Sequence, residues 1–574
     1  MPELSSMVDL LRRRAAEQAN DRAYVFLSEK GIEEAELSFA ELDRRAGVVA
    51  AHLTRQARKG DRALLMFPPG LDFIVAFFGC LVAGAVAVPL MPPRRTSMRD
   101  SSESIIADCG ARIVLTTGRL MENRTDILAR LRPNDLVWLA VDTLREIPSD
   151  ATTASHALTR EDIAFLQYTS GSTSAPKGVM VTHGNLLENL EMIRIAFGNT
   201  RHSTYVAWVP FYHDMGLVLN VLESFYIGAL HVVLSPTSFV QRPLTWLRAI
   251  SRYRAEVSSA PNFAFDLCVS RFRADQMEGV DLSSWKIAFN AAEPVRAATI
   301  EEFAATFAPY GFDARTMYPG YGMAEATLLI SGGHRGEEVV TRSVSREMLQ
   351  RGAIGAAKNA ADVQAIVGCG RALVGEEIAI VDPPTRGRQP ADAVGEIWVR
   401  GANVAAGYWQ NAAATAEAFE ATIAGEGGAH WLRTGDLGFL DDAGRIYITG
   451  RIKDVIIIYG NNHYPQDIEA TMQSADPALR PNCGAAFSYL DPLGVEKLVL
   501  VQEVERTQRH RISMDEIEQR IRVAIAKEHE ITVHEVVLIR PGSIPKTTSG
   551  KIQRRLTQQL WHERALEVLS PIEP

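Results

Sequence analysis

Short apolar runs that alternate with amphipathic segments restrict the fold of this chain more than any other feature of its sequence. Residues 39–53 carry apolar side chains at helical spacing behind Ser38, and serine is a residue type that caps helix N-termini. Apolar strands separated by helices are typical of parallel sheets with helices packed on their faces. The sequence therefore predicts an α/β fold built in layers. Four runs have the length and composition of buried strands, at residues 24–27, 63–67, 113–115 and 136–139.

The composition is that of a soluble enzyme with several packed units. At 574 residues the chain is too long for a single hydrophobic core. Hydrophobic residues make up 47% and charged residues 22%, as in ordinary globular proteins. The net charge of −9 argues against a nucleic-acid-binding protein, which needs a basic surface. The five cysteines are scattered and form no Cys-x-x-Cys pair, so neither a disulfide framework nor a zinc site is expected, in line with a reducing cytoplasm.

One segment has the minimum length of a membrane span. Residues 73–90 carry no charge over 18 positions. Gly79, Gly84 and Pro89 interrupt this segment, and its last part reads as a strand. A buried helix that runs into a buried strand is therefore expected. The N-terminus also lacks a basic region followed by an apolar core, so no signal peptide is predicted and the cytoplasm is the expected location.

The stretch Tyr168–Gly178 places glycines, small hydroxyl residues and one lysine after an apolar run. It reads Tyr-Thr-Ser-Gly-Ser-Thr-Ser-Ala-Pro-Lys-Gly. The N–H groups and hydroxyls of such a loop can surround phosphate oxygens, and Lys177 adds a positive charge. The loop differs from a Walker A motif, because Pro176 precedes the lysine and Gly178 stands where a Ser or Thr would hold magnesium. We expect a strand, a phosphate-binding loop, a second strand or bend and a helix; the alternative is a solvated connection.

Polar residues follow three further predicted strands. Residues 205–210 lead to His213, residues 287–290 lead into Ala291-Ala292-Glu293, and the string from Tyr318 to Thr327 contains Tyr321 and Glu325. Ligands collect at the carboxyl ends of strands in α/β sheets. Taken singly, a histidine can be a core residue and a glycine-rich turn can be a tight bend. Three such strand ends after one phosphate loop favour a nucleotide pocket.

A second group of elements begins after residue 452. Before it, Asp436 lies in a Gly-Asp turn, where a carboxylate can accept hydrogen bonds from both ribose hydroxyls; an ordinary turn is the alternative. Near the end of the chain, residues 540–555 include five basic and no acidic side chains, among them Lys551. A loop of this kind is usually solvated surface, but here it is expected to bring a cation to phosphate. The elements expected in this region are helices at 466–472 and 514–526 and strands at 498–502 and 536–539.

In this order along the chain, the motifs resemble those of the adenylate-forming, or AMP-binding, superfamily of acyl-CoA synthetases, luciferases, adenylation domains and fatty acyl-AMP ligases. Three strings narrow the resemblance to the fatty acyl-AMP ligases: Asn290–Val295, Tyr321–Leu329 and Gly450–Glu469. About 40 residues separate Thr327 from Gly370, whereas CoA synthetases cross this gap with far fewer. An insertion at about residues 331–360 is therefore expected, although it can also be a surface loop without a catalytic role.

Two positions depart from the family pattern. Ala291 stands where glycine is common, which puts the backbone near adenine in doubt. Asn461 stands where arginine is common after Gly460, which puts any contact of that arginine in doubt.

The resemblance implies a domain organisation. The N-terminal domain, residues 1–452, is expected to contain layered α/β subdomains and a β-barrel-like subdomain. A small mobile α/β domain, residues 453–574, is expected to carry the catalytic lysine and to turn about a hinge at Lys453.

The resemblance also implies roles for individual side chains. The loop that holds the β- and γ-phosphates matches Thr169, Ser170, Gly171, Ser172, Thr173 and Lys177. The remaining nucleotide-binding positions match Asn290, Ala291, Ala292, Tyr321, Gly322, Met323, Asp436, Ile448 and Arg451, with Tyr321 on adenine and Asp436 and Arg451 on ribose. Glu325 and Thr169 match magnesium-associated residues, His213 matches a residue at the mouth of the acyl tunnel, and Lys551 matches the lysine that bridges carboxylate and α-phosphate.

The implied activity has two steps that use ATP and Mg²⁺. A medium- or long-chain fatty acid and ATP give acyl-adenylate and pyrophosphate, and the acyl group then moves to the phosphopantetheine thiol of an acyl carrier protein for lipid, polyketide or lipopeptide synthesis. No carrier domain follows Lys551 in the sequence, so a discrete carrier is expected, with Arg554 and Arg555 as a basic docking surface. The alternatives are a long-chain acyl-CoA synthetase, an amino-acid adenylation module, and a non-catalytic acyl- or nucleotide-binding protein. The length of the acid, the carrier and the oligomeric state are not predicted.

Overall fold

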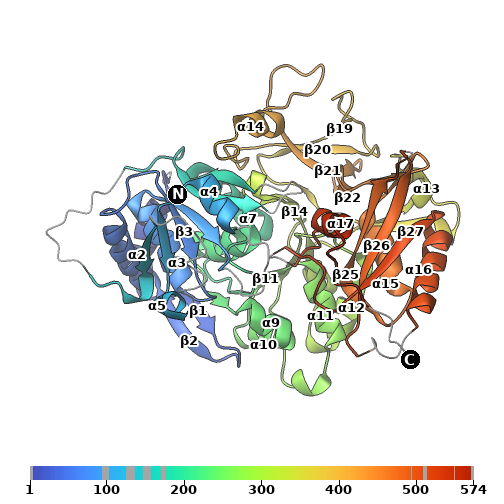
Figure 1. Cartoon of the computed structure of the whole chain (residues 1–574). Coiled ribbons are helices and arrows are strands. Elements are labelled where there is room, and N and C mark those ends of the chain that lie inside the picture. The colour runs from blue at the N-terminus through green and yellow to red at the C-terminus, as the bar shows by residue number, and fades with distance from the viewer. Residues whose placement is uncertain are drawn as a thin grey trace.

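The computed structural model describes residues 4–92, 102–123, 136–146, 157–169, 176–492, 494–507, 513–547 and 550–569. The elements of the N-terminal part lie on the left and centre of Figure 1, and those of the C-terminal part lie on the right. The chain is a mixed α/β protein with a large N-terminal and a small C-terminal domain, as predicted.

A six-stranded sheet contains the apolar runs that the sequence marked as buried strands. Its order is β6-β5-β3-β4-β7-β8. Five strands run parallel and β8 pairs antiparallel at the edge. The strands are β3 (Arg62–Met66), β4 (Val86–Leu90), β5 (Ile113–Thr116), β6 (Val137–Ala140), β7 (Ile163–Thr169) and β8 (Lys177–Thr182).

The uncharged segment 73–90 is a helix followed by a strand, as predicted. Helix α3 (Asp72–Ala83) ends at Gly84, whose φ of 69° is a left-handed conformation that glycine adopts without strain. The chain then enters β4, which is buried at every position. Among the described residues, no helix combines the length and the apolar character that crossing a bilayer requires.

A seven-stranded sheet, of order β13-β12-β11-β9-β10-β1-β2, positions most of the polar strand ends. All neighbours run parallel except β1 and β2. The carboxyl ends of β9, β12 and β13 therefore open toward the same edge, which brings distant segments together. The strands are β1 (Arg22–Leu27), β2 (Glu33–Ser38), β9 (Tyr205–Ala207), β10 (His231–Val233), β11 (Val257–Ala260), β12 (Ile287–Asn290) and β13 (Met317–Pro319).

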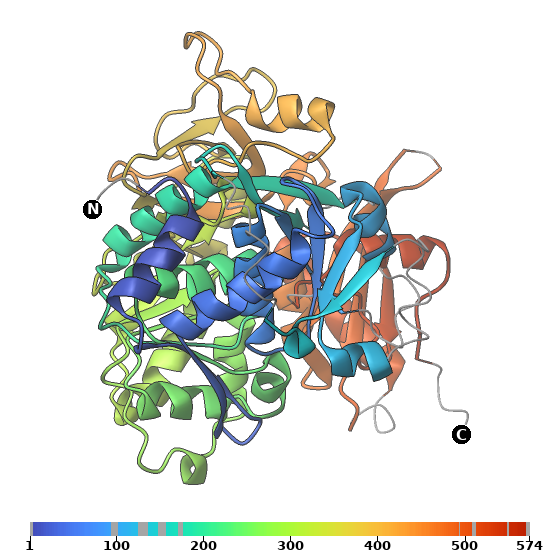
Figure 2. The ribbon, with the colours of Figure 1, turned by 90° about the vertical axis from the view of Figure 1, so that its left-hand side faces the viewer.

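Helices fill the space between these two sheets and cover their outer faces (Figures 1 and 2). The core between the sheets includes α1 (Met7–Glu17), α2 (Phe39–Leu53) and α3. Successive residues of a strand point to opposite faces, so Tyr24 packs in the shared core and Val25 in the core beneath α10 (Leu244–Arg252). The layered architecture follows directly from this alternation.

Further antiparallel sheets belong to the N-terminal domain, for which the resemblance implied a β-barrel-like subdomain without giving its place. One has the order β14-β15-β18 and the other the order β19-β20-β21-β22. The strands are β14 (Tyr321–Gly322), β15 (Leu329–Gly332), β18 (Arg371–Ala372), β19 (Glu377–Val381), β20 (Gly395–Arg400), β21 (Leu432–Leu440) and β22 (Ile446–Arg451).

The C-terminal domain has a three-stranded sheet of order β25-β26-β27 with separate apolar cores on its two faces. Its elements agree with the four predicted from the sequence. They include β23 (Ile456–Ile458), β24 (Asn461–His463), α15 (Pro465–Ser474), β25 (Leu479–Leu490), β26 (Glu496–Val504), α16 (Met514–His529), β27 (Val533–Ile539) and α17 (Arg554–His562).

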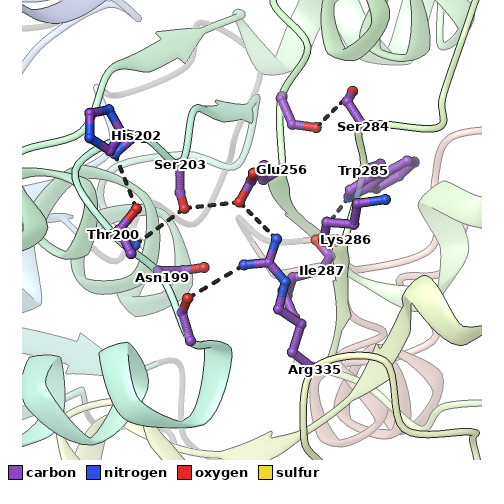
Figure 3. Close-up of polar contacts among 12 residues, drawn as sticks. Asn199, Thr200, His202, Ser203, Glu256, Ser284, Trp285, Lys286, Ile287 and Arg335 are labelled. Atoms are coloured by element: carbon purple, nitrogen blue, oxygen red, sulfur yellow. Dashed lines mark hydrogen bonds and ion pairs between the residues drawn. The ribbon is translucent and has the colours of Figure 1, made fainter.

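The segment expected as an insertion joins the two domains. It contains β16 (Thr341–Ser345) and α13 (Arg346–Gln350), and β16 pairs with β17 (Val363–Val367). On the N-terminal side, Arg335 binds the Glu256 carboxylate at 2.8 Å, close to the 199–203 turn (Figure 3). On the C-terminal side, Arg346 pairs with Glu528 at 2.6 Å. Arg335 and Arg346 therefore anchor this segment to one domain each.

Candidate active site

The predicted phosphate loop connects the two strands at the edge of the six-stranded sheet. Thr169 lies opposite Lys177 in the β7–β8 pairing, and α7 (His183–Phe197) follows β8 directly. The predicted strands and helix on both sides of the loop are therefore confirmed. The loop positions and the side chain of Thr169 lie outside the described residues, so their contact with phosphate stays a prediction for Thr169, Ser170, Gly171, Ser172 and Thr173.

Tyr408, a residue that the sequence did not single out, connects Lys177 with Glu325. The Lys177 ammonium nitrogen lies 4.7 Å from the centre of the Tyr408 ring. The Tyr408 hydroxyl donates a hydrogen bond to Glu325 Oε1 at 2.9 Å. Glu325 is buried in the short turn η6 (Ala324–Ala326); burial raises the pKa of its carboxyl, and the bond from Tyr408 opposes that shift. The only sequence signal for Tyr408 is its place in a Gly-Tyr-Trp string.

Glu325 offers a single buried carboxylate to a cation. The described residues contain no group of three or more His, Cys, Asp or Glu side chains arranged to hold a metal ion. Magnesium in nucleotide-dependent enzymes is commonly held by one or two carboxylates together with substrate phosphates. The donor set therefore fits a magnesium ion that arrives with the nucleotide.

Tyr321, Asp436 and Arg451 form one connected cluster. Asp436 and Arg451 lie opposite each other on β21 and β22. Arg451 Nε donates to Asp436 Oδ1 at 2.7 Å, and the Tyr321 hydroxyl donates to Oδ2 at 2.8 Å. The Asp436 carboxylate raises the pKa of Arg451, which keeps the guanidinium charged. Next to Tyr321, a Cβ at Gly322 would lie 1.8 Å from the Leu328 carbonyl oxygen, so only glycine fits there.

Asn290 ends β12 at the same edge of the seven-stranded sheet. Its amide nitrogen donates to Asn262 Oδ1 at 3.2 Å, whereas its own Oδ1 has no hydrogen-bond partner in the described part of the chain. A buried, unpaired acceptor suits a donor group of a ligand. The left-handed φ of 72° falls on Ala292 and not on Ala291, the position that departs from the family pattern. Met323 and Ile448 are partly buried and pack against the core between the sheets.

His213 follows β9 and pairs with its neighbour. Its Nδ1 lies 2.7 Å from Asp214 Oδ1, and the π-helix η2 (Met215–Leu222) begins at the next residue. π-helical turns occur frequently at functional sites. Burial would raise the pKa of Asp214, but His213 and Lys551 outweigh it and hold that pKa below its usual value. Asp214 therefore stays ionised beside the histidine that the sequence selected.

The loop that carries Lys551 lies against the N-terminal domain. The Lys551 backbone N–H donates to Thr547 Oγ1 at 3.0 Å. A Cβ at the adjacent Gly550 would lie 3.5 Å from the ring of Phe263, in α11 (Asn262–Ser270) of the N-terminal domain. The catalytic candidate at the end of the chain is therefore brought to the strand ends of the large sheet.

Charges of both signs surround the Lys551 side chain. Burial lowers the pKa of Lys551, and the nearby Arg451 lowers it further. Asp214, Glu293 and Asp436 act in the opposite direction and favour the charged ammonium. Lys551, Arg451 and Asp436 were assigned to the site from the sequence, and Glu293 was noted there at a strand end; the electrostatic effect of Asp214 and Glu293 on Lys551 comes from the structure.

Two expectations for the C-terminal domain have different outcomes. Arg554 donates to both carboxylate oxygens of Glu469, at 2.6 and 2.8 Å, and to Asp454 at 3.3 Å. The expectation that Arg554 forms a free docking surface is therefore wrong, because its guanidinium is committed within this domain; Arg555 is exposed. Lys453 lies exposed in the turn after β22, and its role as a hinge stays a prediction.

Comparisons with known proteins identify the family of this chain. The family model described as AMP-binding enzyme matches residues 11–409, and the model described as Disco-interacting protein 2-like, AMP domain, matches residues 453–570. The medium-chain fatty acid–acyl-carrier-protein ligase JamA of Moorena producens is 43% identical and is covered to 96%, over 99% of this chain. The fatty acid AMP ligase of Legionella pneumophila has a TM-score of 0.77 at 39% identity, with 99% of this chain and 98% of that chain covered. A fatty acyl-adenylate ligase of the same organism, solved with acyl adenylate and pyrophosphate, has a TM-score of 0.76 at 38% identity over the same shares.

The fold, the strand-end site and these matches together define an ATP-dependent, adenylate-forming ligase, and the chain belongs to the family of AMP-binding enzymes. Within that family it belongs to the fatty acyl-AMP ligases.

Proposed function

We propose that this protein activates a medium- or long-chain fatty acid with ATP and Mg²⁺ and transfers the acyl group to the phosphopantetheine thiol of a discrete acyl carrier protein. The observation that carries the proposal is the position of Lys551. The adjacent Gly550 lies against Phe263 of the N-terminal domain, and Lys551 interacts electrostatically with Asp214, Glu293, Asp436 and Arg451 of that domain. A lysine held there can approach a carboxylate and a phosphate at the same time.

The first step joins two anions. A fatty-acid carboxylate oxygen attacks the α-phosphorus of ATP, the bond from this phosphorus to the bridging oxygen breaks, and pyrophosphate leaves. Positive charge must offset the repulsion between the two reactants, and positioning supplies most of the remaining catalysis. Lys551 would screen the carboxylate and the α-phosphate, and Lys177 with the loop 169–173 would hold the leaving phosphates. Glu325 and Thr169 would hold magnesium, which supplies further charge neutralisation on phosphate oxygens when bound.

The nucleoside and the acid occupy different parts of the site. Asp436 retains lone pairs for ribose hydroxyls beside its bonds to Tyr321 and Arg451. Adenine would lie along Tyr321, with Gly322, Met323 and Ile448 nearby and Asn290 to Ala292 at its edge. His213 would stand where the acyl chain enters, held by Asp214.

The second step needs a different arrangement of the two domains. The carrier thiol attacks the carbonyl carbon of the acyl-adenylate, and AMP leaves with the bonding electrons. We place the domain boundary at residues 452 and 453, with Lys453 as the hinge, so that the C-terminal domain turns away from the adenylation arrangement. JamA and the similarly named ligase TtuA of Teredinibacter turnerae support a carrier-protein acceptor by their names.

Coenzyme A is the second candidate acceptor. A Mycobacterium tuberculosis protein that carries the name fatty-acid–CoA ligase, fadD25, is 38% identical over 97% of this chain. The expected insertion favours the carrier protein, because its Arg346 pairs with Glu528 and ties it to the C-terminal domain, which we expect to turn before thiol attack. We place the protein in the cytoplasm, where ATP and carrier proteins are available.

One experiment separates the acceptors. Purified protein is incubated with ATP, Mg²⁺ and a mixture of C6 to C18 fatty acids, and then with phosphopantetheinylated carrier protein or with CoA. Mass spectrometry is expected to detect acyl-adenylate in the first incubation and acyl-carrier protein in the second. Acyl-CoA as the main product would select the CoA-synthetase alternative, and the absence of any acyl-adenylate would reject the proposed function.

A further inference from the structure

Residues 403–409, which we term the bridging segment, connect the phosphate hairpin with the Glu325 turn. On one side the Met180 N–H donates to the Gly407 carbonyl at 2.9 Å, and the Trp409 N–H donates to the Gly178 carbonyl at 2.7 Å. On the other side the Ala405 N–H donates to the Glu325 carbonyl at 2.9 Å. The bridging segment therefore continues the sheet past β8 and fixes the Glu325 turn relative to that strand.

The Glu325 turn is held in a strained conformation. Thr327 has φ 65° and ψ −56°, and the Leu328 N–H donates to the Ala326 carbonyl at 2.7 Å, which together define a γ-turn of positive φ. Such a conformation is strained for a residue other than glycine and persists where surrounding contacts enforce it. Here the Thr327 hydroxyl donates to the Asn403 carbonyl at 2.6 Å. The bridging segment supplies the enforcing contact.

Within this frame, one side chain touches two groups of opposite charge. Tyr408 is 8% exposed, its hydroxyl bonds Glu325, and its ring faces the Lys177 ammonium. A lysine and a glutamate at a site of low dielectric attract each other strongly and would form an ion pair that occupies both. The hydroxyl gives the carboxylate a donor and the ring gives the ammonium a π face, so each charge has a partner that does not neutralise it.

We propose that Tyr408 is a positioning residue for adenylation, which keeps the Lys177 ammonium and the Glu325 carboxylate apart and directs both to the same magnesium-bound triphosphate. The hydroxyl and the ring have separate tasks: the hydroxyl orients Glu325 toward the cation, and the ring holds Lys177 until a phosphate takes its place. The inference rests on the proposed function for the identity of the nucleotide.

Two substitutions separate these tasks. Tyr408→Phe keeps the ring and removes the hydroxyl, whereas Tyr408→Leu removes both. Tyr447→Phe is the matched control, because Tyr447 also donates to a carboxylate, Asp441 Oδ2 at 3.1 Å, and Asp441 has no place in the proposed machinery. Thermal unfolding of each variant verifies that the fold is retained.

The binding of ATP alone and of ATP with Mn²⁺ is measured by calorimetry, and the Mn²⁺ is also followed by electron paramagnetic resonance. Tyr408→Phe is expected to bind ATP alone within about twofold of wild type but Mn²⁺–ATP about tenfold more weakly, since a hydrogen bond to a charged group is worth about that factor. Its kcat for ATP–pyrophosphate exchange should fall about tenfold or more, with a higher Mg²⁺ requirement and an unchanged KM for the fatty acid. Tyr408→Leu should also bind ATP alone several-fold more weakly.

Unchanged Mn²⁺–ATP binding and kcat in Tyr408→Phe would overturn the inference, and so would an equal loss of metal-free ATP binding in both variants. An effect of the same size in Tyr447→Phe would also overturn it. Failure of the proposed function has a different signature, because wild type would then form no acyl-adenylate while the Mn²⁺–ATP difference between wild type and Tyr408→Phe persisted.

Discussion

Lys551 is the residue on which the first chemical step depends most. Its ammonium lies among carboxylates and one guanidinium, so its removal leaves the carboxylate–phosphate repulsion unscreened. We expect Lys551→Ala to slow ATP–pyrophosphate exchange on the order of 10²–10³-fold, by analogy with the loss of one oxyanion-stabilising donor. Transfer from chemically supplied acyl-adenylate to the carrier should persist. Undiminished pyrophosphate release in this variant would show that Lys551 is not the screening cation.

Asp436 provides a second test at the scale of one residue. Its carboxylate accepts bonds from Tyr321 and Arg451 and still has lone pairs for ribose. Asp436→Asn keeps the shape, removes the charge and replaces one acceptor by a donor, which opposes the guanidinium. We expect the KM for ATP to rise about tenfold while the KM for the fatty acid changes little. An unaltered ATP titration would contradict a ribose role, and an equal rise for both substrates would indicate a general disturbance of the site.

Sequence reasoning found the charged residues of the site because each lies in a motif with a physical signature. Lys177 follows a hydroxyl-rich loop, Asp436 lies in a Gly-Asp turn, and Lys551 lies in a basic run. It missed Tyr408 because the partner carboxylate is 83 positions away in the chain, and no local pattern encodes that contact. It also assigned Arg554 to a surface, because the pairing with Glu469 is set by the packing of α17 on the rest of the domain.

Among the elements, β17, which pairs with β16 of the expected insertion, contacts the C-terminal domain directly. Gln364 on β17 donates to Asp467 Oδ2 at 2.8 Å, in the first turn of α15. His463, Asp467 and His529 line the same small cavity of about 10 Å³. Burial accordingly raises the pKa of Asp467 to about 6, although Gln364 and the more distant Arg346 lower it.

Asp467→Asn tests this interface through its pH dependence. The pKa of about 6 lies above that of an aspartate in the unfolded chain, about 3.9, so the folded state binds this proton more tightly. The contribution of Asp467 to the free energy of unfolding is therefore fully present below pH 4 and is lost as the pH rises to 6. Asparagine keeps the acceptor for Gln364 without the charge. We expect the variant to be more stable than wild type at pH 7.5 by about 1 kcal/mol, after allowance for partial solvent exposure, and equal at pH 4.

Chemical denaturation at pH 4 and pH 7.5 measures the difference in the free energy of unfolding of the C-terminal domain between wild type and Asp467→Asn. Gln364→Ala is the control, because it removes the donor and leaves the carboxylate. An equal gain at pH 4 and pH 7.5 would indicate improved packing rather than a lost charge, and would contradict the interpretation.

Most elements were predictable because buried parallel strands are short apolar runs. The runs 63–67, 113–115 and 136–139 and the helix–strand segment 73–90 all appear where the sequence placed them. The π-helical character of η2 was not predicted, since an apolar run such as Met215–Leu222 does not reveal its hydrogen-bond spacing. The bridging segment was also missed, because its hydrogen bonds go to β8 and to the Glu325 turn, both of which lie far away along the chain.

The two large sheets of the N-terminal domain share one core, and the imidazole of His231 lies beside that core. His231 on β10 is fully buried, and both of its ring nitrogens lack a hydrogen-bond partner among the described residues. The rings of Tyr24 and Tyr205 lie at 6.1 and 6.4 Å from it. Burial lowers the pKa of His231 to about 3. This histidine therefore links the stability of the large sheet to pH.

Acid is expected to destabilise the folded chain through His231. A histidine in the unfolded chain has a pKa of about 6.5, so the folded state, with a pKa of about 3, binds the proton less tightly. The stability from this group is complete above pH 6.5 and is lost as the pH falls toward 3; at pH 5 the loss is about 2 kcal/mol. His231→Phe removes the titration and keeps an aromatic ring between the two tyrosines. Between pH 7.5 and pH 5, its urea midpoint should fall less than that of wild type, by a margin that corresponds to about 2 kcal/mol.

His183→Phe is the matched comparison, because His183 is also buried, with a pKa of about 4, but accepts a hydrogen bond from the Met7 N–H. The His183→Phe variant should therefore lose stability at pH 7.5. Parallel pH dependence in wild type and His231→Phe would mean that the proton taken up on acid unfolding binds elsewhere in the molecule.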